Sequence, residues 1–290
     1  MKRLLIVLFL CFDALALGAQ EISVFRHQVE KGYDFLLYTP EGYNELPDSA
    51  KAKVPLVMHL HGGSLVGSNV LNSMRYGTIA AIRFGRDIDA LVLNPQTPGK
   101  EAGAIGAWNP EKLCNLLDWT MEHFPYDSCR VYVVGMSTGG YGTMNFVNAH
   151  PERVAAAMAL CGGCSSKTYE GISQVPMWII HGTADVTVGV GNSRKVYNWL
   201  VENNCAERVI FDTLPGYDHS SLARFFFMPM TYQWLFSHSR EQEGHPVNRT
   251  VKLVEPTAFT AYSNPDTEFK KKVRITDPGV VPIKEPVKEQ

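Results

Sequence analysis

The stretch Gly135-Met136-Ser137-Thr138-Gly139 decides the fold. It follows an apolar run over residues 130–134, which is typical of a buried strand, and it opens a stretch with a helical pattern. Small residues two before and two after the serine leave room for a very tight, strained turn that presents the serine hydroxyl outward. We therefore predict that Ser137 is a nucleophile at a strand-to-helix corner.

Short apolar runs alternate with helical patterns on both sides of this corner. The runs lack strict alternation of apolar and polar residues, which favours strands buried on both faces of a parallel sheet. Besides 130–134, strands are expected at residues 35–38, 54–59, 90–93, 155–160, 176–180 and 208–214. Helices are expected at residues 111–123, 193–203 and 220–237, the last of them broken or kinked at Pro229. This alternation predicts an α/β protein with a mainly parallel central sheet flanked by helices.

The overall composition narrows the class of protein. The chain has 290 residues, of which 45% are apolar and 19% charged, so it is too apolar for wholesale disorder and long enough for one large α/β domain. A formal net charge of −2 argues against a general nucleic-acid-binding surface. Neither oligomeric state nor protein partner can be deduced from these numbers.

Both ends of the chain differ from its middle. Lys2 and Arg3 precede a mostly apolar run over residues 4–17 and two small residues, a pattern that predicts a secretory signal peptide over residues 1–19. The alternative is a buried N-terminal strand. Export would make the protein secreted or periplasmic, with no stable membrane span after processing. Residues 20–240 are then the catalytic domain, and residues 241–290 are a proline-rich, extended tail with one edge strand near 271–275.

The cysteines predict neither a disulfide framework nor a metal site. Cys11 would leave with the signal peptide, and an odd number, five, would remain in the rest of the chain. Cys161 and Cys164 have the spacing of a redox or metal motif, but no second pair of ligands follows at zinc-site spacing. We interpret Cys161 as a buried thiol at a strand end and leave any disulfide pairing open. No metal and no organic cofactor is expected.

A serine hydroxyl needs a base to become a nucleophile at neutral pH. His219 is the best candidate among the nine histidines, because it follows the strand expected at 208–214. It therefore lies beyond the carboxyl end of a strand, at the edge of the sheet where Ser137 is also expected. A satisfied surface histidine is the alternative.

The base in turn needs a carboxylate that orients its ring. Asp185 follows the strand expected at 176–180 and reaches the same edge of the sheet, so we assign this role to Asp185. Asp212 lies within a strand, and Asp218 is adjacent to His219 in sequence, a poor position for bonding the ring.

The negative oxygen that forms on an attacked carbonyl group needs fixed hydrogen-bond donors. The backbone N–H of Thr138, at the start of a helix, is one candidate. Gly63 is the first choice for the second donor and Ser64 its neighbour, because both follow the strand expected at 54–59. His59 and His61 resemble a metal pair, but no third ligand is evident, and we interpret His61 as bracing this loop.

Three residues are assigned to substrate binding. Ser64 and Met136 are neighbours in sequence of the expected donor and the expected nucleophile. Trp108, on a glycine-rich loop after the strand at 90–93, is a candidate aromatic wall for an acyl or sugar group. A tryptophan that covers the edge of the core is an equally good interpretation of Trp108.

Several motifs together resemble a known family. They are Tyr-Asp-Ser-Cys-Arg-Val-Tyr-Val-Val-Gly-Met-Ser-Thr-Gly-Gly-Tyr-Gly-Thr at 126–143, His-Gly-Gly at 61–63, Cys-Gly-Gly at 161–163, His-Gly-Thr-Ala-Asp at 181–185 and Trp-Leu-Phe-Ser-His-Ser-Arg at 234–240. Over about residues 33–240 the chain resembles secreted α/β-hydrolases of the polyhydroxybutyrate-depolymerase and feruloyl or acetyl-xylan esterase type. The resemblance implies an α/β-hydrolase fold, in which Ser137, Asp185 and His219 follow the usual chain order. One departure is Asp218, where the family often has glycine.

The expected function is that of a serine carboxylesterase acting through an acyl-enzyme. The resemblance implies feruloyl or acetyl esters on polysaccharides as substrates. A serine peptidase or an acyltransferase would use the same residues on other substrates. A non-catalytic carbohydrate-binding or scaffold protein with this fold is the alternative from another class.

Overall fold

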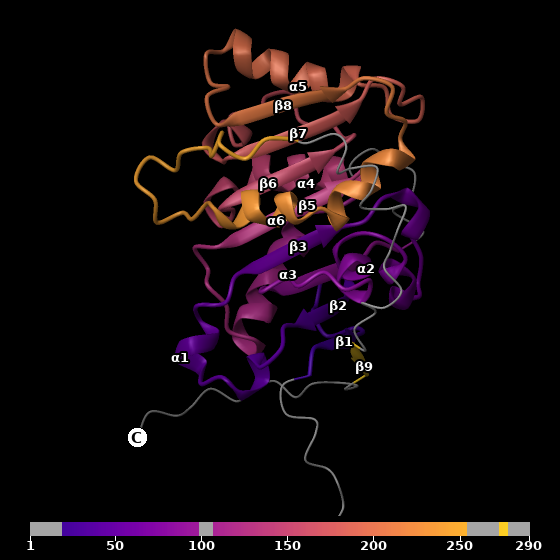
Figure 1. Cartoon of the computed structure of the whole chain (residues 1–290), viewed down its shortest axis with the longest axis vertical. Coiled ribbons are helices and arrows are strands. Elements are labelled where there is room, and N and C mark those ends of the chain that lie inside the picture. The colour runs from indigo at the N-terminus through magenta and orange to yellow at the C-terminus, as the bar shows by residue number, and fades with distance from the viewer. Residues whose placement is uncertain (1–18, 99–106, 254–272, 278–290) are drawn as a thin grey trace, which may run out of the picture.

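The computed structural model describes residues 19–98, 107–253 and 273–277, and within them the strands form one nine-stranded sheet (Figure 1). The strands are β1 (Glu21–Phe25), β2 (Asp34–Thr39), β3 (Leu56–Leu60), β4 (Leu91–Gln96), β5 (Val131–Met136), β6 (Ala156–Leu160), β7 (Met177–Gly182), β8 (Val209–Leu214) and β9 (Arg274–Thr276). Their order across the sheet is β8-β7-β6-β5-β3-β4-β2-β1-β9.

The sheet is mainly parallel, as the sequence predicted. Strands β3 to β8 run parallel to one another, whereas β2 is antiparallel to both of its neighbours, β4 and β1. All seven strands expected within residues 20–240 are present. Strand β1 was not expected, because its five residues carry only a short alternating pattern. The strand order reverses beside β3, since β4 lies on one side of it and β5 on the other.

Helices cover both faces of the sheet. The α-helices are α1 (Asp48–Lys51), α2 (Thr78–Arg83), α3 (Pro110–His123), α4 (Thr138–Ala149), α5 (Gly191–Glu202) and α6 (Pro229–Phe236). Short 3-10 helices are η1 (Tyr43–Glu45), η2 (Gly63–Leu65), η3 (Val70–Met74), η5 (Pro151–Arg153), η6 (Ile172–Gln174) and η7 (Ser220–Phe227). The helix expected at 220–237 is divided into η7 and α6, with Pro229 at the first position of α6, as predicted.

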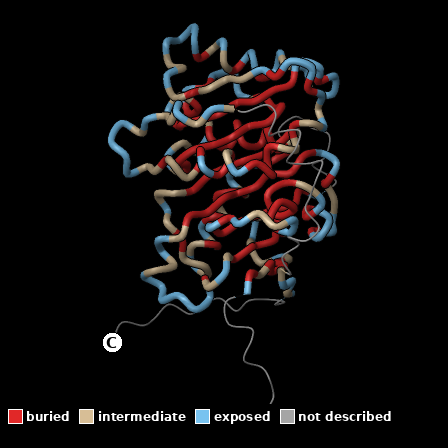
Figure 2. Tube along the Cα trace, in the orientation of Figure 1, coloured by how far each residue is buried: buried red, intermediate tan, exposed pale blue. Residues whose placement is uncertain are grey.

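The core has two halves, one on each side of the sheet. Leu56 and Met58 of β3 join the half that packs under α3, α4 and α5, while Val57 between them joins the half under α2, η7 and α6. Figure 2 shows the central strands buried and the exposed residues mainly in the surrounding loops. Strands buried on both faces explain why their sequences read as continuous apolar runs.

The turn between β5 and α4 is as tight as the motif predicted. Ser137, the single residue between strand and helix, has a φ angle of 59°, which is uncommon for a residue with a side chain. A Cβ on Gly139 would overlap the carbonyl oxygen of Leu60, and a Cβ on Gly135 would overlap the backbone of Gly139. Helix α4 therefore sits directly against β3 and β5 only because both flanking residues are glycine.

The segment after Arg240 is attached to the domain as far as it is described. Residues 241–253 contain no helix or strand, but the Asn248 carbonyl accepts a hydrogen bond from Trp234 Nε1 at 2.9 Å, and Val247 and Val251 pack against the core. The edge strand expected near 271–275 corresponds to β9, which pairs in parallel with β1. The expected signal peptide lies almost wholly outside the described residues. Among the described helices, none combines the length and the apolar character that a membrane span requires.

Gly139→Ala is expected to lower the free energy of unfolding by about 1–3 kcal/mol, because the added methyl group has no space beside Leu60. Equilibrium unfolding in urea measures this change. Gly189→Ala is the matched control, since its methyl group would meet nothing within 4 Å, and it should alter stability by no more than about 0.5 kcal/mol. Equal stability of the two variants would contradict the packing described here.

Candidate active site

One edge of the sheet collects most of the polar residues singled out in the sequence. The carboxyl ends of parallel strands meet at the same edge. Gly62 and Gly63 follow β3, Ser137 follows β5, Asp185 lies three residues after β7, and His219 lies five residues after β8. Because β3 and β5 are neighbours at the point where the strand order reverses, a crevice is expected between their loops.

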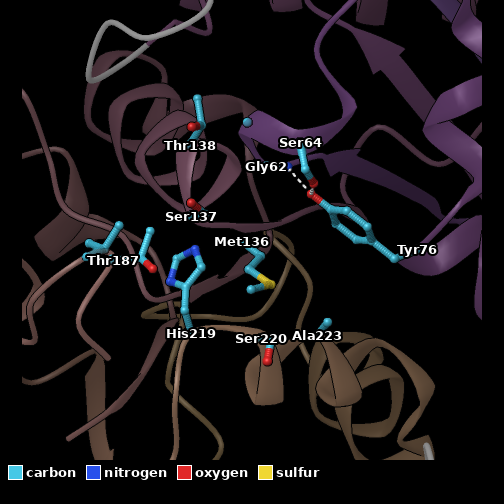
Figure 3. A pocket seen from close by; sticks show the side chains of 12 residues that line it. Gly62, Ser64, Tyr76, Met136, Ser137, Thr138, Thr187, His219, Ser220 and Ala223 are labelled. Carbon is cyan, nitrogen blue, oxygen red and sulfur yellow. Dashed lines mark hydrogen bonds between the residues drawn. The ribbon is translucent and has the colours of Figure 1, made fainter. Parts of the chain in front are cut away.

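A cavity of about 610 Å³ occupies this position (Figure 3). Its lining includes Ser137 and His219 together with the loop after β3 and the start of η7. The complete lining is Gly62, Gly63, Ser64, Tyr76, Met136, Ser137, Thr138, Thr187, Val188, His219, Ser220 and Ala223. Side chains of Met136, Val188 and Ala223 make much of this surface apolar, so the cavity can hold an organic group rather than only water.

Asp185 and His219 form a hydrogen-bonded pair. His219 Nδ1 lies 2.7 Å from Asp185 Oδ2, and the side chain of Asp185 is fully buried. The other carboxylate oxygen, Oδ1, accepts hydrogen bonds from the backbone N–H groups of Thr187 and Val188 at 2.9 and 2.8 Å. The carboxylate is therefore fixed in position and can hold the imidazole ring in one orientation.

The two acidic residues that the sequence analysis set aside have other partners. Asp212 accepts a hydrogen bond from Trp178 Nε1 at 2.7 Å, away from the cavity. Asp218 accepts hydrogen bonds from the backbone and the hydroxyl of Ser221 at 2.8 and 2.7 Å, so it caps η7, the element that begins directly after His219. These hydrogen bonds lower the pKa of the Asp218 carboxyl group to about 2. Asp218 therefore stabilises the turn that leads into η7.

A buried histidine supports the loop that carries Asp185. His181 Nε2 lies 2.7 Å from the Val188 carbonyl oxygen, and its Nδ1 lies 2.8 Å from the hydroxyl of Ser193. Burial lowers the pKa of His181, so the ring is neutral at neutral pH. This neutral ring connects the end of β7 to α5 and places no positive charge beside Asp185.

Ser137 and His219 both line the cavity. In Figure 3 His219 lies next to Ser137 and its imidazole points toward it. Since Nδ1 is engaged with Asp185, the ring nitrogen left for the cavity is Nε2. The backbone of Ser137 is held by a hydrogen bond from its N–H to the Leu160 carbonyl at 2.9 Å and by one from the Tyr141 N–H to its own carbonyl at 2.9 Å. A strained residue held in this way is typical of functional positions.

Gly63 and Thr138, the two residues expected to donate to a developing oxyanion, lie side by side. A methyl group on Gly63 would be 3.4 Å from Thr138 Oγ1, and both residues line the cavity. Thr138 begins α4, whose N-terminus adds a partial positive charge at this point. Within the described part of the chain, neither backbone N–H has a hydrogen-bond acceptor.

His61 braces this loop, as the sequence analysis proposed. Its Nδ1 lies 2.8 Å from the Gly62 carbonyl oxygen, and its Nε2 accepts a hydrogen bond from the Thr97 N–H at 3.3 Å. The ring is buried, and burial lowers its pKa to about 4. A neutral ring with both nitrogens engaged is a structural element and not a metal ligand.

The residues assigned to substrate binding have different positions. Ser64 and Met136 line the cavity. Trp108 does not: only 1% of it is exposed, it packs edge-on against His61, and its Nε1 donates a hydrogen bond to the His61 carbonyl at 3.3 Å. The prediction of an aromatic wall is therefore wrong, and Trp108 covers the edge of the core, held against α4 where Gly142 leaves room for its ring. Residues 103–106 of its loop lie outside the described residues.

A buried thiol lies beside the acid–histidine pair. Cys161 directly follows β6, and its Sγ, an Asp185 carboxylate oxygen and a His219 ring nitrogen lie within 4.8 Å of one another. Burial raises the pKa of the thiol, and the nearby Asp185 carboxylate raises it further, so the thiol stays protonated. The prediction of a buried thiol at a strand end is confirmed. All five cysteines of the described residues are free.

Tyr76 and Val188 are lining residues that sequence reasoning missed. Tyr76 follows η3 in an irregular connection, and Val188 lies in the loop between β7 and α5. Neither position carries a motif, because what brings them to the cavity is the path of a loop and not a repeating pattern.

No family model matches the chain. Among curated proteins, acetylxylan esterase A of Aspergillus awamori is 32% identical over 146 residues, which cover 47% of this chain and 46% of the relative. Acylamino-acid-releasing enzyme 2 of Oryza sativa subsp. japonica is 26% identical over 132 residues, which cover 43% of this chain and 17% of the relative. The chain thus spans less than half the length of these two curated relatives.

Solved structures match over more of the chain. A thermostable esterase has 25% sequence identity and a TM-score of 0.64, and the match covers 76% of this chain and 64% of that one. The fold of this protein is the α/β-hydrolase fold. The resemblance to esterases of that fold, expected from the sequence, is confirmed.

The two buried histidines of this region predict a loss of stability in acid. Burial lowers the pKa of His59 to about 3 and that of His61 to about 4, whereas a histidine in the unfolded chain has a pKa near ~6.5. Between these values the unfolded chain binds more protons, so the free energy of unfolding should fall as the pH decreases from about 6.5 to about 4. Each histidine contributes a slope of at most about 1.4 kcal/mol per pH unit.

Urea unfolding at a series of pH values measures this slope. His61→Gln should be less stable than the wild type but should show a shallower slope, because one depressed pKa has been removed. A free energy of unfolding that stays constant or increases on acidification below pH ~6 would contradict the assignment of neutral, buried rings.

Proposed function

We propose that the protein is a serine carboxylesterase with Ser137 as nucleophile, His219 as base and Asp185 as the residue that orients the base. The observation that carries the proposal is the 2.7 Å contact of His219 Nδ1 with the buried Asp185 carboxylate, in a cavity that Ser137 also lines. The tight turn at Ser137 adds support, because such a turn presents its residue outward and Ser137 lines that cavity.

The reaction follows from these positions. The oxygen of Ser137 attacks the ester carbonyl carbon, and its proton passes to His219 Nε2. The backbone N–H groups of Thr138 and Gly63 stabilise the negative oxygen of the tetrahedral intermediate. When this intermediate collapses, His219 gives its proton to the departing alcohol and the acyl group stays on Ser137. Water, deprotonated by His219, then releases the acid and restores the enzyme.

We propose acetyl or feruloyl esters on polysaccharides as substrates. The name of the Aspergillus awamori relative, acetylxylan esterase, supports this class, and the partly apolar lining supports an acyl group in the cavity. A signal peptide over residues 1–19 and a secreted or periplasmic location would suit a polymeric substrate outside the cell. Polysaccharide degradation is therefore the proposed context.

A second candidate is the release of acyl groups from amino acids, which the name of the Oryza sativa relative supports. That reaction breaks an amide and has an amine as leaving group, so His219 would have to protonate a nitrogen. The ratio of kcat/KM for an aryl ester and the matching anilide separates the two reactions. Transfer to sugar acceptors in place of water would identify an acyltransferase. A carbohydrate-binding protein without turnover would leave both substrates intact.

Ser137→Ala is expected to reduce kcat for p-nitrophenyl acetate by at least about 10³-fold, because no acyl-enzyme can form. Circular dichroism and urea unfolding should show a fold about as stable as that of the wild type, since only the hydroxyl group is removed. Residual activity within tenfold of the wild type would contradict the assignment.

Asp185→Asn is expected to lower kcat by about 10³–10⁴-fold, because an amide cannot hold the ring of His219 in the required tautomer. The matched control is Asp218→Asn, which lies next to His219 but caps η7 and does not orient the ring. Steady-state kinetics with p-nitrophenyl acetate distinguish them. A larger loss in Asp218→Asn than in Asp185→Asn would reverse the roles proposed here.

A further inference from the structure

The hydroxyl of Tyr76 lies in the candidate active site without a role in the chemistry described so far. It faces the loop after β3 from the side of the cavity opposite His219 (Figure 3). The Gly62 N–H donates a hydrogen bond to this hydroxyl at 2.8 Å, and the Ser64 hydroxyl donates a second, longer one at 3.5 Å.

The proton of the Tyr76 hydroxyl remains available for a hydrogen bond. A tyrosine hydroxyl has one proton to donate and accepts through its oxygen. In both contacts Tyr76 is the acceptor, so its own proton is not used by Gly62 or Ser64. Within the described part of the chain no acceptor for that proton is found. A donor in a partly apolar cavity with no protein acceptor is available to a ligand.

The hydroxyl is also close to the nucleophile. A methyl group placed on Gly62 would lie 2.7 Å from Tyr76 Oη and 3.3 Å from Ser137 Cβ, so a single small group would touch both. Gly62 and Gly63 are consecutive, and the Gly63 N–H is one of the two proposed oxyanion donors. The Tyr76 proton is therefore presented next to the place where the carbonyl oxygen of a substrate attacked by Ser137 would lie.

The charge state of Tyr76 favours donation. Burial raises the pKa of the phenol, so the hydroxyl stays protonated throughout the neutral and mildly alkaline range. The two hydrogen bonds that its oxygen accepts draw electron density toward their donors and make the remaining proton a better donor. A neutral phenol can thus stabilise a developing negative charge without losing its proton.

We propose that Tyr76 is a catalytic residue, a third donor to the oxyanion beside the backbone N–H groups of Thr138 and Gly63. This proposal rests on the proposed serine esterase function. As the bond between Ser137 Oγ and the carbonyl carbon forms, the π electrons of the carbonyl move to its oxygen, and the Tyr76 O–H donates a hydrogen bond to that oxygen. The Ser137 proton goes to His219, and Tyr76 keeps its own proton throughout.

The first test is Tyr76→Phe, assayed with p-nitrophenyl acetate beside the wild type and Ser137→Ala. Loss of one oxyanion donor is expected to lower kcat by about 10²-fold, with KM changed less than about threefold, because the bond strengthens only in the transition state. Tyr43→Phe is the matched control, since its hydroxyl donates to the Pro125 carbonyl far from the cavity, and its kcat should equal that of the wild type.

A second readout separates donation from bracing of the Gly62 loop, since phenylalanine abolishes both. Replacing Tyr76 by 3-fluorotyrosine makes the hydroxyl a stronger donor and a weaker acceptor. Donation to the oxyanion predicts a kcat at or above that of the wild type, whereas bracing predicts a kcat that falls toward the value of Tyr76→Phe.

The outcomes distinguish this proposal from the function on which it rests. Wild-type kcat in Tyr76→Phe, or a fall in kcat with 3-fluorotyrosine, overturns the role of Tyr76 while Ser137→Ala remains inactive and the esterase function stands. A wild-type protein that is inert toward the ester, and equal to Ser137→Ala, overturns the esterase function and the role of Tyr76 with it.

Discussion

The close contact of α4 with β3 and β5 is the constraint on which the rest of the site depends. Gly139 lies so near the Leu60 carbonyl that no side chain fits between them, and this distance forces the chain to turn within one residue, Ser137. The strain of that residue is of the order of ~1–3 kcal/mol, which a large buried sheet can sustain. This turn places the Ser137 hydroxyl at the carboxyl edge of the sheet, beside the N-terminus of α4.

The second feature of the site is that the buried titratable groups around Asp185 are neutral. His59, His61 and His181 are all buried and kept neutral by burial, and the thiol of Cys161 is kept protonated. Among the described residues, Asp185 is thus the one buried carboxylate, and it lies beside a partly exposed imidazole. Hydrogen bonds from two backbone N–H groups stabilise its charge. Such an arrangement suits the role of base proposed for His219.

The sequence was more informative about which residues follow the strand ends than about which residues line the cavity. Each of the three predicted catalytic residues, Ser137, Asp185 and His219, follows a strand with a clear apolar run. Because the carboxyl ends of parallel strands lie at the same edge of a sheet, the sequence indicated that all three residues lie at this edge. Trp108 could not be placed, because a tryptophan beside glycines suits a cavity wall and a core edge equally, and only the space left by Gly142 decides between them. Tyr76 and Val188 reach the cavity through irregular loops, for which the sequence offers no periodic signal.

The most direct test of the account is the rate at which a fluorophosphonate probe modifies the intact protein, followed by peptide mapping of the adduct. The convergence of Ser137, His219 and Asp185 predicts rapid, stoichiometric modification of Ser137 in the wild type and a rate at least about 10²-fold lower in His219→Gln. Absence of an adduct on Ser137, or an equal rate in the two proteins, would contradict a site in which the imidazole activates the hydroxyl.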